Sequence, residues 1–275
     1  MTGTLLDRFR LDGRAAIVTA ASRGIGAATA RALAEMGADV VVAARGAEAL
    51  DEVAADIAAL GRKAEVVAAD LSDVAAMPAL VERCRAAFGR VDVVVNNLGG
   101  AYPRPFLDTS PRFLEEALHF NVTTAFALTK AAVPALLEGG GGSVVNITSA
   151  LGRLRERGYL AYATAKGALA HMTRQMAADL APRIRVNAVA PGAVETEALA
   201  GFLTAEVRTT MESLTPLGRL ATPEDIALAV LYLVSDAGGY LTGKVLEVDG
   251  GIEAANLPLG LPDLAPAAAD GEPAP

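Results

Sequence analysis

The sequence predicts an α/β protein whose doubly wound, Rossmann-type parallel sheet has seven strands flanked by helices in three α/β/α layers. Seven short segments rich in Val and Ile alternate with six helical patterns almost to the end of the chain. The strand segments are nearly continuously apolar, which is typical of parallel strands covered on both faces. Gly37, Gly61 and Gly89 follow three of the helical patterns, where a glycine commonly ends a helix. Strands and helices that alternate in this way indicate right-handed crossovers.

The elements follow one another in a regular order. The predicted strands are residues 15–21, 39–44, 64–69, 91–97, 142–149, 184–190 and 244–250. The predicted helices are residues 24–36, 47–60, 74–87, 110–137, 159–180 and 223–235.

Neither an internal repeat nor a domain-sized linker interrupts this alternation, so we expect a single domain over residues 1–264 with its motifs in 11–252. Leucines and prolines recur in residues 253–264, which predicts an extended C-terminal arm packed on a neighbouring subunit or over the pocket. Residues 265–275 are rich in Pro and Ala, and we expect them to be disordered.

The composition limits the classes of function. Apolar residues make up 52% of the 275 residues, charged residues 20%, and the net charge is −8. This acidic balance argues against binding to nucleic acid or to anionic membranes. Cys84 is the single cysteine, so no internal disulfide can form, and charged residues interrupt the N-terminal stretch where a signal peptide would be apolar. The longest aliphatic run near the C-terminus, residues 226–234, is too short to span a bilayer. We expect a cytoplasmic protein.

The stretch TAASRGIG, residues 19–26, joins the first predicted strand to the first helix. Gly24 and Gly26 would let the backbone approach a pyrophosphate at the helix N-terminus, where N–H groups favour an anion. A first glycine is common in such loops, but this chain has Ala20, and we predict a negative φ there because a Cβ makes the left-handed conformation costly. Taken alone, the stretch also fits an ordinary strand-to-helix turn.

The end of the second strand bears on the choice of cofactor. An acidic residue at this point would bind the ribose hydroxyls of NAD, whereas an arginine accommodates the 2′-phosphate of NADP. The chain reads VVVAARG, with Arg45 and no acid, and Arg23 in the first turn can reach the same place. The two arginines favour NADP(H) over NAD(H). The alternative is that both are solvated surface residues.

Tyr162 and Lys166 are four residues apart in YLAYATAKGALA, so on a helix they share one face. An ammonium close to a phenol stabilises the phenolate and lowers its pKa, and such a tyrosine can exchange a proton with a carbonyl or alcohol oxygen. Ser149 ends the preceding strand and could bind the same oxygen. Asn121 lies among apolar neighbours in a predicted helix, where its amide could support a water-mediated proton path.

In order and spacing, TAASRGIG, NNLG (96–99), Asn121, Ser149, YATAK (162–166) and PGAVET (191–196) resemble the motifs of short-chain dehydrogenase/reductases. The chain is similar to the compact branch that includes 3-oxoacyl-carrier-protein reductases and many sugar and steroid dehydrogenases. The resemblance covers about residues 11–252 and implies a catalytic tetrad of Asn121, Ser149, Tyr162 and Lys166. It also implies a homotetramer built on the helices at 110–137 and 159–180. Ala20 and Leu98 depart from the usual motifs.

The resemblance further implies a nicotinamide cofactor site, with Lys166 on the nicotinamide ribose, Asp70 and Leu71 beside the adenine, and Asn97 supporting the strand. Together with the turn and its arginines, the implied cofactor residues are Thr19, Ser22, Arg23, Gly24, Ile25, Gly26, Arg45, Asp70, Leu71, Asn97, Gly99, Tyr162, Lys166, Pro191, Gly192, Val194 and Thr196.

The substrate pocket is expected beside the tetrad, with Ser149, Leu151, Tyr159 and Gly192 in its lining and residues 197–215 as a lid. Tyr159 precedes Tyr162 by three residues, and a packing role remains its alternative. Arg153, Arg155 and Arg157 could recognise an anionic acyl-thioester carrier, or form loop or subunit-interface salt bridges. His119, His171 and Cys84 lack metal-ligand spacing, so no metal site is predicted.

These observations predict an NADP(H)-dependent oxidoreductase that interconverts a ketone and a secondary alcohol, with a 3-oxoacyl thioester as one substrate class. A hydroxysteroid or a sugar or polyol is the alternative substrate within the family. The alternative from another class is a nucleotide-sensing protein that keeps the fold without catalysis.

Overall fold

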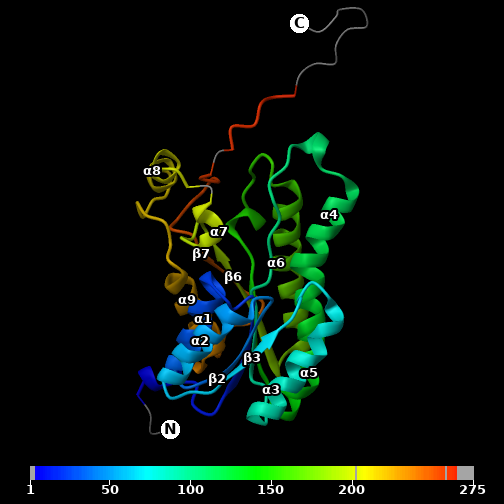
Figure 1. Cartoon of the computed structure of the whole chain (residues 1–275), viewed down its shortest axis with the longest axis vertical. Helices are drawn as coiled ribbons and strands as arrows, with labels where there is room; N and C mark the ends of the chain where they lie inside the picture. Colours follow the sequence, from blue (N-terminus) through cyan, green and yellow to red (C-terminus); the bar gives the residue numbers. More distant parts are fainter. Residues whose placement is uncertain (1–3, 202, 258, 265–275) are drawn as a thin grey trace, which may run out of the picture.

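The computed structural model describes residues 4–201, 203–257 and 259–264, and over these residues it contains a sheet of seven parallel strands (Figure 1). The strand order is β3-β2-β1-β4-β5-β6-β7, so the chain winds outward from β1 in one direction and then from β4 in the other. The strands are β1 (Ala15–Thr19), β2 (Asp39–Ala44), β3 (Ala64–Ala68), β4 (Val93–Asn96), β5 (Gly142–Ile147), β6 (Ile184–Pro191) and β7 (Val245–Val248). The predicted doubly wound α/β sheet is confirmed.

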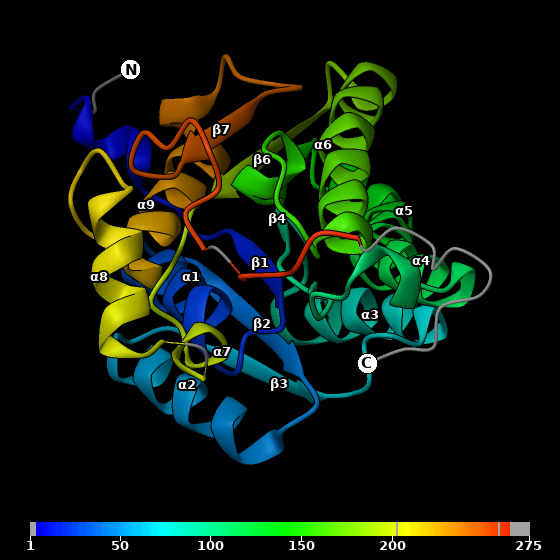
Figure 2. The same ribbon diagram turned by 90° about the horizontal axis from the view of Figure 1, so that it is seen from above.

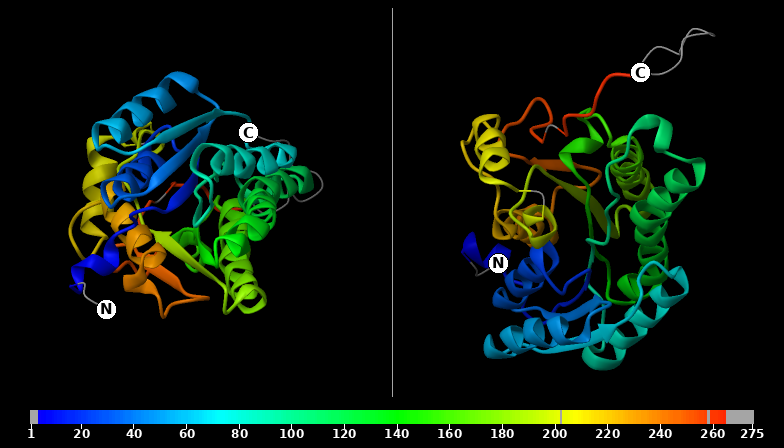
Figure 3. Two further views of the ribbon diagram at one scale, coloured as in Figure 1. Left: turned by 90° about the horizontal axis from the view of Figure 1, so that it is seen from below. Right: turned by 45° about the horizontal axis from the view of Figure 1, so that its top comes forward.

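Helices cover both faces of the sheet (Figures 2 and 3). One core cluster joins the sheet to α1, α2 and α9 through side chains such as Leu33, Leu50 and Ile226. The other joins it to α3, α5 and α6 through Leu80, Leu128 and Met176. The helices are α1 (Gly24–Glu35), α2 (Ala47–Ala59), α3 (Met77–Phe88), α4 (Pro111–Leu118), α5 (Thr124–Glu138), α6 (Leu160–Leu180), α7 (Glu197–Ala200), α8 (Ala205–Ser213) and α9 (Pro223–Val234).

The long helix predicted over residues 110–137 is interrupted by a turn of π-helix. α4 ends at Leu118, residues His119–Thr123 form the π turn, and α5 begins at Thr124. Pro111–Glu138 is long and apolar enough by length and composition to cross a membrane. In the structure it lies along the face of the sheet that α3 and α6 also cover, and 44% of its most apolar window is buried, as in the core helix of a layered protein.

Small residues on this helix serve packing within the chain. Ala117, Ala125 and Ala132 are buried in the single chain, so they are not free to meet a second subunit. Phe126 and Leu137 lie on its exposed side. Phe126 and Leu137 are therefore the large apolar side chains that α5 leaves available for a contact between subunits.

The backbone prediction for Ala20 was wrong. Its φ is +52°, in the left-handed region, and the neighbouring Gly24 has φ +53°. The carbonyl oxygen of Ala20 accepts a hydrogen bond from Asn97 Nδ2 at 3.2 Å and lies against Gly26, where an added Cβ would collide with it. The chain must turn sharply to place this carbonyl between two neighbours, and that tertiary fit outweighs the local penalty on an alanine.

The loops that follow the strands gather at one edge of the sheet, at the upper end of Figure 1. α7 and α8 lie there, within the segment 197–215 that was predicted as a lid. The first part of the C-terminal arm crosses the same edge. Residues 265–275, expected to be disordered, lie outside the described residues.

Candidate active site

The ends of β1 and β4 are tied together below the first turn. Thr19 Oγ1 accepts hydrogen bonds from the backbone N–H groups of Asn97 (2.9 Å) and Leu98 (3.1 Å) and donates to the carbonyl of Val95 at 3.3 Å. Leu98, which departs from the family motif, is partly buried against the core beneath α3 and α5. These bonds hold the two strand ends in register where the predicted cofactor loop begins.

The N-terminus of α1 faces this edge without a side-chain cap. Arg23, the N-cap residue, makes no side-chain hydrogen bond to the N–H groups of the first turn among the described residues. The N–H groups of the first turn, which includes Gly24, Ile25 and Gly26, are the groups that bind a phosphate in such a loop. The Asn97 and Ala20 contacts leave no room for a Cβ at Gly26, so this glycine keeps the turn tight.

Ser149 and Tyr162 lie at the start of the loop after β5 and in the first turn of α6. Ser149 Oγ accepts a hydrogen bond from the N–H of Leu151 at 3.2 Å, which orients the hydroxyl. Burial raises the pKa of Tyr162 above 10, the Ser149 hydroxyl lowers it, and the nearby Tyr159 raises it. The rings of Tyr159 and Tyr162 meet edge to face with their centroids 6.2 Å apart. Tyr159 lies at the cap position of α6, one residue before the helix begins.

Lys166 lies one turn further along α6 and is only 3% exposed. Its Nζ donates to the carbonyl of Ile147, at the end of β5, at 2.9 Å. The Nζ is 5.7 Å from the centre of the Tyr162 ring. Burial lowers the pKa of Lys166 to about 8. We expected the ammonium to lower the pKa of Tyr162, but in the protein alone burial outweighs any such effect and raises it.

Asn121 lies in the π turn, on the same side of Gly99 as Lys166. Its side chain accepts from Gly100 N (2.9 Å) and donates to the carbonyls of Gly100 (2.9 Å) and Ala117 (2.9 Å). A Cβ built at Gly99 would lie 2.6 Å from both Asn121 Oδ1 and Lys166 Nζ. The amide oxygen and the ammonium group therefore both lie against the backbone of Gly99, and a larger residue at this position would collide with them. π turns of this kind occur frequently at functional sites.

The donors of Lys166 suit the ribose of a nicotinamide cofactor. An ammonium has three N–H donors, and within the described residues Lys166 Nζ uses one of them, on Ile147. Two donors on a buried group therefore need acceptors, and ribose hydroxyls can supply them. Gly99, Asn121 and Lys166, which lie close together here, are all among the site residues that the family resemblance implies.

The remaining predicted cofactor residues border the same edge. Gly192, after Pro191, leaves so little room that a Cβ would lie 2.8 Å from the Asp249 backbone. Val194 is buried and bridges to Ala221, and Thr196 Oγ1 caps α7 by accepting from Leu199 N at 3.4 Å. On the other side of the edge, Asp70 accepts from Ser72 N and Oγ (3.0 and 2.8 Å), and Leu71 is buried in the core.

The two arginines predicted to select NADP(H) differ in their surroundings. Arg23 Nη1 forms an ion pair with Glu197 Oε2 of α7 at 2.9 Å, and both side chains are about two thirds exposed (64% and 68%). Arg45 is exposed after β2, and its charge helps to lower the pKa of Asp70, mainly set by the hydrogen bonds from Ser72. The structure thus brings Arg45 to the side of the predicted adenosine site, whereas Arg23 is paired with α7, in the segment predicted as a lid.

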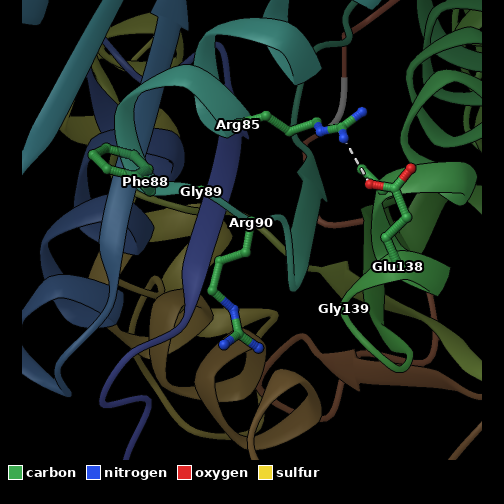
Figure 4. A pocket seen from close by; sticks show the side chains of 7 residues that line it. Arg85, Phe88, Gly89, Arg90, Glu138 and Gly139 are labelled. Atoms are coloured by element: carbon green, nitrogen blue, oxygen red, sulfur yellow. Dashed lines mark hydrogen bonds and ion pairs between the residues drawn. The ribbon is translucent and has the colours of Figure 1, made fainter.

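A cavity of about 360 Å³ lies at the opposite edge of the sheet, where β4 and β5 begin (Figure 4). Arg85 reaches across it to Glu138 with an Nη2–Oε2 distance of 2.7 Å. Arg90 turns away to pair with Asp92. The residues that line this cavity include none of the predicted site residues, and the strand ends that carry the tetrad lie at the other edge.

Comparison with known proteins identifies the family. Residues 19–253 match the family model described as enoyl-(acyl carrier protein) reductase. The chain belongs to the short-chain dehydrogenase/reductase family. It is an oxidoreductase of this family, whose members use a nicotinamide cofactor.

Three relatives place it among the short-chain dehydrogenase/reductases. An uncharacterized oxidoreductase of Mycobacterium tuberculosis is 54% identical, over 94% of this chain and 100% of the relative. A cis-4-hydroxycyclohexanecarboxylate dehydrogenase of Sinomonas cyclohexanicum is 41% identical, over 88% of this chain and 97% of the relative. The solved structure of a 7 alpha-hydroxysteroid dehydrogenase, complexed with NADH and 7-oxo glycochenodeoxycholic acid, has a TM-score of 0.88 and 38% identity. The match covers 94% of this chain and 100% of that one.

The sequence did not reveal what the basic cluster after β5 contacts. Arg153 pairs with Asp249 (2.8 Å) and Glu247 (3.0 Å) at the end of β7. Arg157 pairs with Asp263 at 3.0 Å. Two of the three arginines are therefore used in contacts within the chain. The acids that pair with them lie about 100 residues away, so no local pattern could have found them.

Proposed function

We propose that this short-chain dehydrogenase/reductase interconverts a secondary alcohol and a ketone with NADP(H), with Tyr162 as the group that exchanges a proton with the substrate oxygen. The observation that carries the proposal is the closeness of three side chains: Tyr162 is hydrogen-bonded to the Ser149 hydroxyl, and Lys166 Nζ lies 5.7 Å from the centre of the Tyr162 ring. A phenol, a hydroxyl and an ammonium converge there at the edge where doubly wound sheets bind their ligands.

Each member of the tetrad has a separate role. Ser149, oriented by Leu151 N–H, binds the substrate oxygen from one side while Tyr162 donates or accepts the proton. Lys166 binds the nicotinamide ribose, and when protonated its charge favours the phenolate of Tyr162. Asn121 orders the backbone at Gly100 and supports a water-mediated proton path from Lys166. When bound at this site, a nicotinamide would supply or take up the hydride at the carbinol carbon.

NADP(H) is the proposed cofactor because Arg45, and Arg23 once released from Glu197, supply positive charge where the 2′-phosphate would lie. The end of β2 also lacks the acid that binds the ribose hydroxyls of NAD. The hydroxysteroid dehydrogenase structure contains NADH, so the measurement must include both cofactors.

An alicyclic alcohol or ketone is the proposed substrate class. The relatives named for a hydroxysteroid and for a hydroxycyclohexanecarboxylate act on ring carbons. The pairing of Arg153 and Arg157 with acids of this chain removes two of the three positive charges that an anionic acyl carrier would need. A 3-oxoacyl thioester remains the second candidate, because a 3-oxoacyl-[acyl-carrier-protein] reductase of Thermotoga maritima is 34% identical to this chain. A cytoplasmic homotetramer is the proposed working form, as the family resemblance implies.

The test is a comparison of the full-length protein with its Tyr162→Phe variant. We expect the wild type to oxidise NADPH in the presence of an alicyclic ketone, and the variant to lose activity by about 10²–10⁴-fold, the usual contribution of a general acid. Binding of NADPH should change by less than about twofold, since the phenol hydroxyl is one contact among many. Tyr159→Phe is the matched control, because the ring is kept beside Tyr162 and only a hydroxyl is removed.

Retained turnover in Tyr162→Phe would overturn the proposed mechanism. A wild type that binds NADPH but reduces no ketone, alicyclic or 3-oxoacyl thioester, and oxidises no alcohol would instead support a nucleotide-sensing protein without catalysis.

A further inference from the structure

The chain continues beyond β7 across the edge of the sheet that carries Tyr162. After the buried Ile252, residues 253–257 and 259–264 run from the side of α8 and β7 over the middle of that edge toward α6 (red in Figure 2). Leu257, Leu259 and Leu261 are half-buried, whereas Leu264 is 67% exposed. We call residues 253–264 the C-terminal arm; Pro258 lies outside the described residues.

The arm is fixed to the lid by Asn256. This side chain is 6% exposed, and its Nδ2 donates to Thr215 Oγ1 at 2.9 Å and to the carbonyl of Met211, in α8, at 3.4 Å. A buried amide left without partners would be costly, so these bonds hold the arm at a defined place on α8.

The other end of the arm is fixed to the loop before α6. The guanidinium of Arg157 donates to the carbonyl of Pro262 at 2.5 Å and to Asp263 Oδ1 at 3.0 Å. Arg153 donates to the carbonyl of Ile252 at 2.7 Å, at the point where the arm begins. Two arginines of one loop therefore hold both ends of the arm, and the arm spans the distance between the lid and the catalytic helix.

Between these fixed points, two leucines reach the rim of the candidate site. A Cβ built at Gly158 would lie 2.9 Å from Leu261 Cδ1 and 3.1 Å from Leu259 Cδ1. Gly158 directly precedes Tyr159, whose ring meets that of Tyr162. Arg104 N donates to the carbonyl of Gly158 at 2.8 Å, which adds the loop after β4 to the same rim.

We propose that the C-terminal arm is the outer wall of the substrate site and that Leu259 and Leu261 select large, apolar ring ketones over small ones. This inference rests on the proposed function. Half-buried leucines retain apolar surface that a substrate can cover, and a fused-ring ketone extends further from its oxygen than a single ring, so it has more apolar surface to place against them. The arm thus determines substrate size, and the tetrad determines the reaction.

The experiment uses the full-length chain with the double substitution Leu259→Ala and Leu261→Ala. The substrates are 2-decalone, with two fused rings, and cyclohexanone, with one, each reduced with NADPH. We expect the KM for 2-decalone to rise about tenfold, in the range for lost methylene groups in an apolar pocket. The KM for cyclohexanone, the KM for NADPH and both kcat values should stay within about twofold, since the tetrad is untouched.

Leu264→Ala is the matched control, because it removes the same atoms from an exposed leucine of the same arm and should behave as the wild type. If the double variant fails to fold, Arg157→Gln loosens the arm without opening the apolar contacts and should raise the KM for 2-decalone alone, by a smaller factor. Equal changes for both ketones, or no change for either, would overturn the proposal.

A binding measurement separates this inference from the proposed function. Calorimetry on Tyr162→Phe with NADP+ gives the Kd of 2-decalol without turnover. A Kd that the two leucine substitutions weaken about tenfold supports the arm as a wall even if the reaction proves different. A Kd that they leave unchanged, or no binding of 2-decalol at all, contradicts it even if Tyr162 is the proton donor.

Discussion

Lys166 and Tyr162 share one face of α6, with the Lys166 Nζ 5.7 Å from the centre of the Tyr162 ring and hydrogen-bonded to the carbonyl of Ile147. Burial acts on the two groups in opposite directions: it lowers the pKa of the lysine to about 8 and raises that of the tyrosine. In both cases the neutral form is favoured. The site therefore holds a lysine whose charge is unfavourable for folding, and the roles proposed for Lys166 at the cofactor ribose and beside Tyr162 would account for its presence.

Replacing Lys166 by methionine should stabilise the protein and abolish its activity. The substitution removes a buried ammonium and keeps an unbranched apolar side chain of similar length. We expect the free energy of unfolding at pH 7 to rise by about 1–3 kcal/mol, as for other buried charges replaced by apolar groups. Urea denaturation followed by circular dichroism measures this, with Lys63→Met, at an exposed lysine, as the control within about 0.5 kcal/mol of the wild type.

The pH dependence of that gain has a defined sign. Below pH 8 the lysine is protonated in both the folded and unfolded states, so the stability of the wild type is reduced by the full free-energy cost of burying the charged ammonium. Between about pH 8 and the ordinary value of 10.5, the unfolded state binds more protons, so wild-type stability gains from this group as the pH rises. The difference in the free energy of unfolding between Lys166→Met and the wild type should therefore become smaller between about pH 8 and pH 10.5. A constant difference from pH 7 to 10 would contradict the lowered pKa.

Alcohol oxidation should depend on pH through Tyr162. Burial places the pKa of this phenol above 10, and oxidation requires the deprotonated form, so kcat for the alcohol should rise with pH through the alkaline range. Ketone reduction requires the protonated phenol and should change little below that range. Because Ser149 lowers the pKa, Ser149→Ala should shift the oxidation profile to higher pH. A profile that does not move would show that Ser149 acts on the substrate oxygen alone.

Glu197 should limit the affinity for NADPH. It pairs with Arg23, which is also a candidate ligand of the 2′-phosphate, so Glu197→Gln frees the arginine. The pair is exposed, and exposed pairs contribute about 0.2–1 kcal/mol, so the KM for NADPH should fall by roughly 1.5- to 5-fold while that for NADH stays unchanged. Glu195→Gln is the matched control, since this acid is two residues away and pairs with Arg208. An equal effect of both variants would indicate a general change in the electric field.

Ala20→Gly should stabilise the first turn. The left-handed conformation costs an L-residue about 1–2 kcal/mol, and a glycine at this position avoids that cost. Part of the gain is offset because glycine has more backbone freedom to lose when the chain folds. We expect a net gain of about 0.5–1 kcal/mol in the free energy of unfolding, with turnover retained. Ala55→Gly, on the exposed face of α2, should instead lose about 0.5–1 kcal/mol. Equal losses in both variants would show that Ala20 is not strained.

The sequence predicted the sheet well because its five central strands, β2, β1, β4, β5 and β6, are buried on both faces. Runs such as Asp39–Ala44 and Gly142–Ile147 carry Val and Ile without a polar alternation, and each lies within two residues of its prediction. The first strand was predicted to residue 21 but ends at Thr19, since Ala20 turns into the left-handed region to meet Asn97. That contact joins residues 77 positions apart, and no local pattern contains it.

The π turn shows a similar limit. Helix propensity and apolar spacing predict one helix over residues 110–137, and nothing local indicates the extra residue per turn at His119–Thr123. Asn121 is fixed there by bonds to Gly100 in another segment, and those bonds determine where its amide lies. The sequence identified the residue, but the structure determined its position.

The sequence by itself determined the doubly wound sheet, the order of the motifs and the identity of the residues around Tyr162, because burial on two faces and helical spacing are local properties. The tertiary structure decided the left-handed turn at Ala20, the pairing of Arg153 and Arg157 and the path of the C-terminal arm. Each of these depends on groups that are far apart in the chain and meet only when the sheet brings its strand ends to one edge.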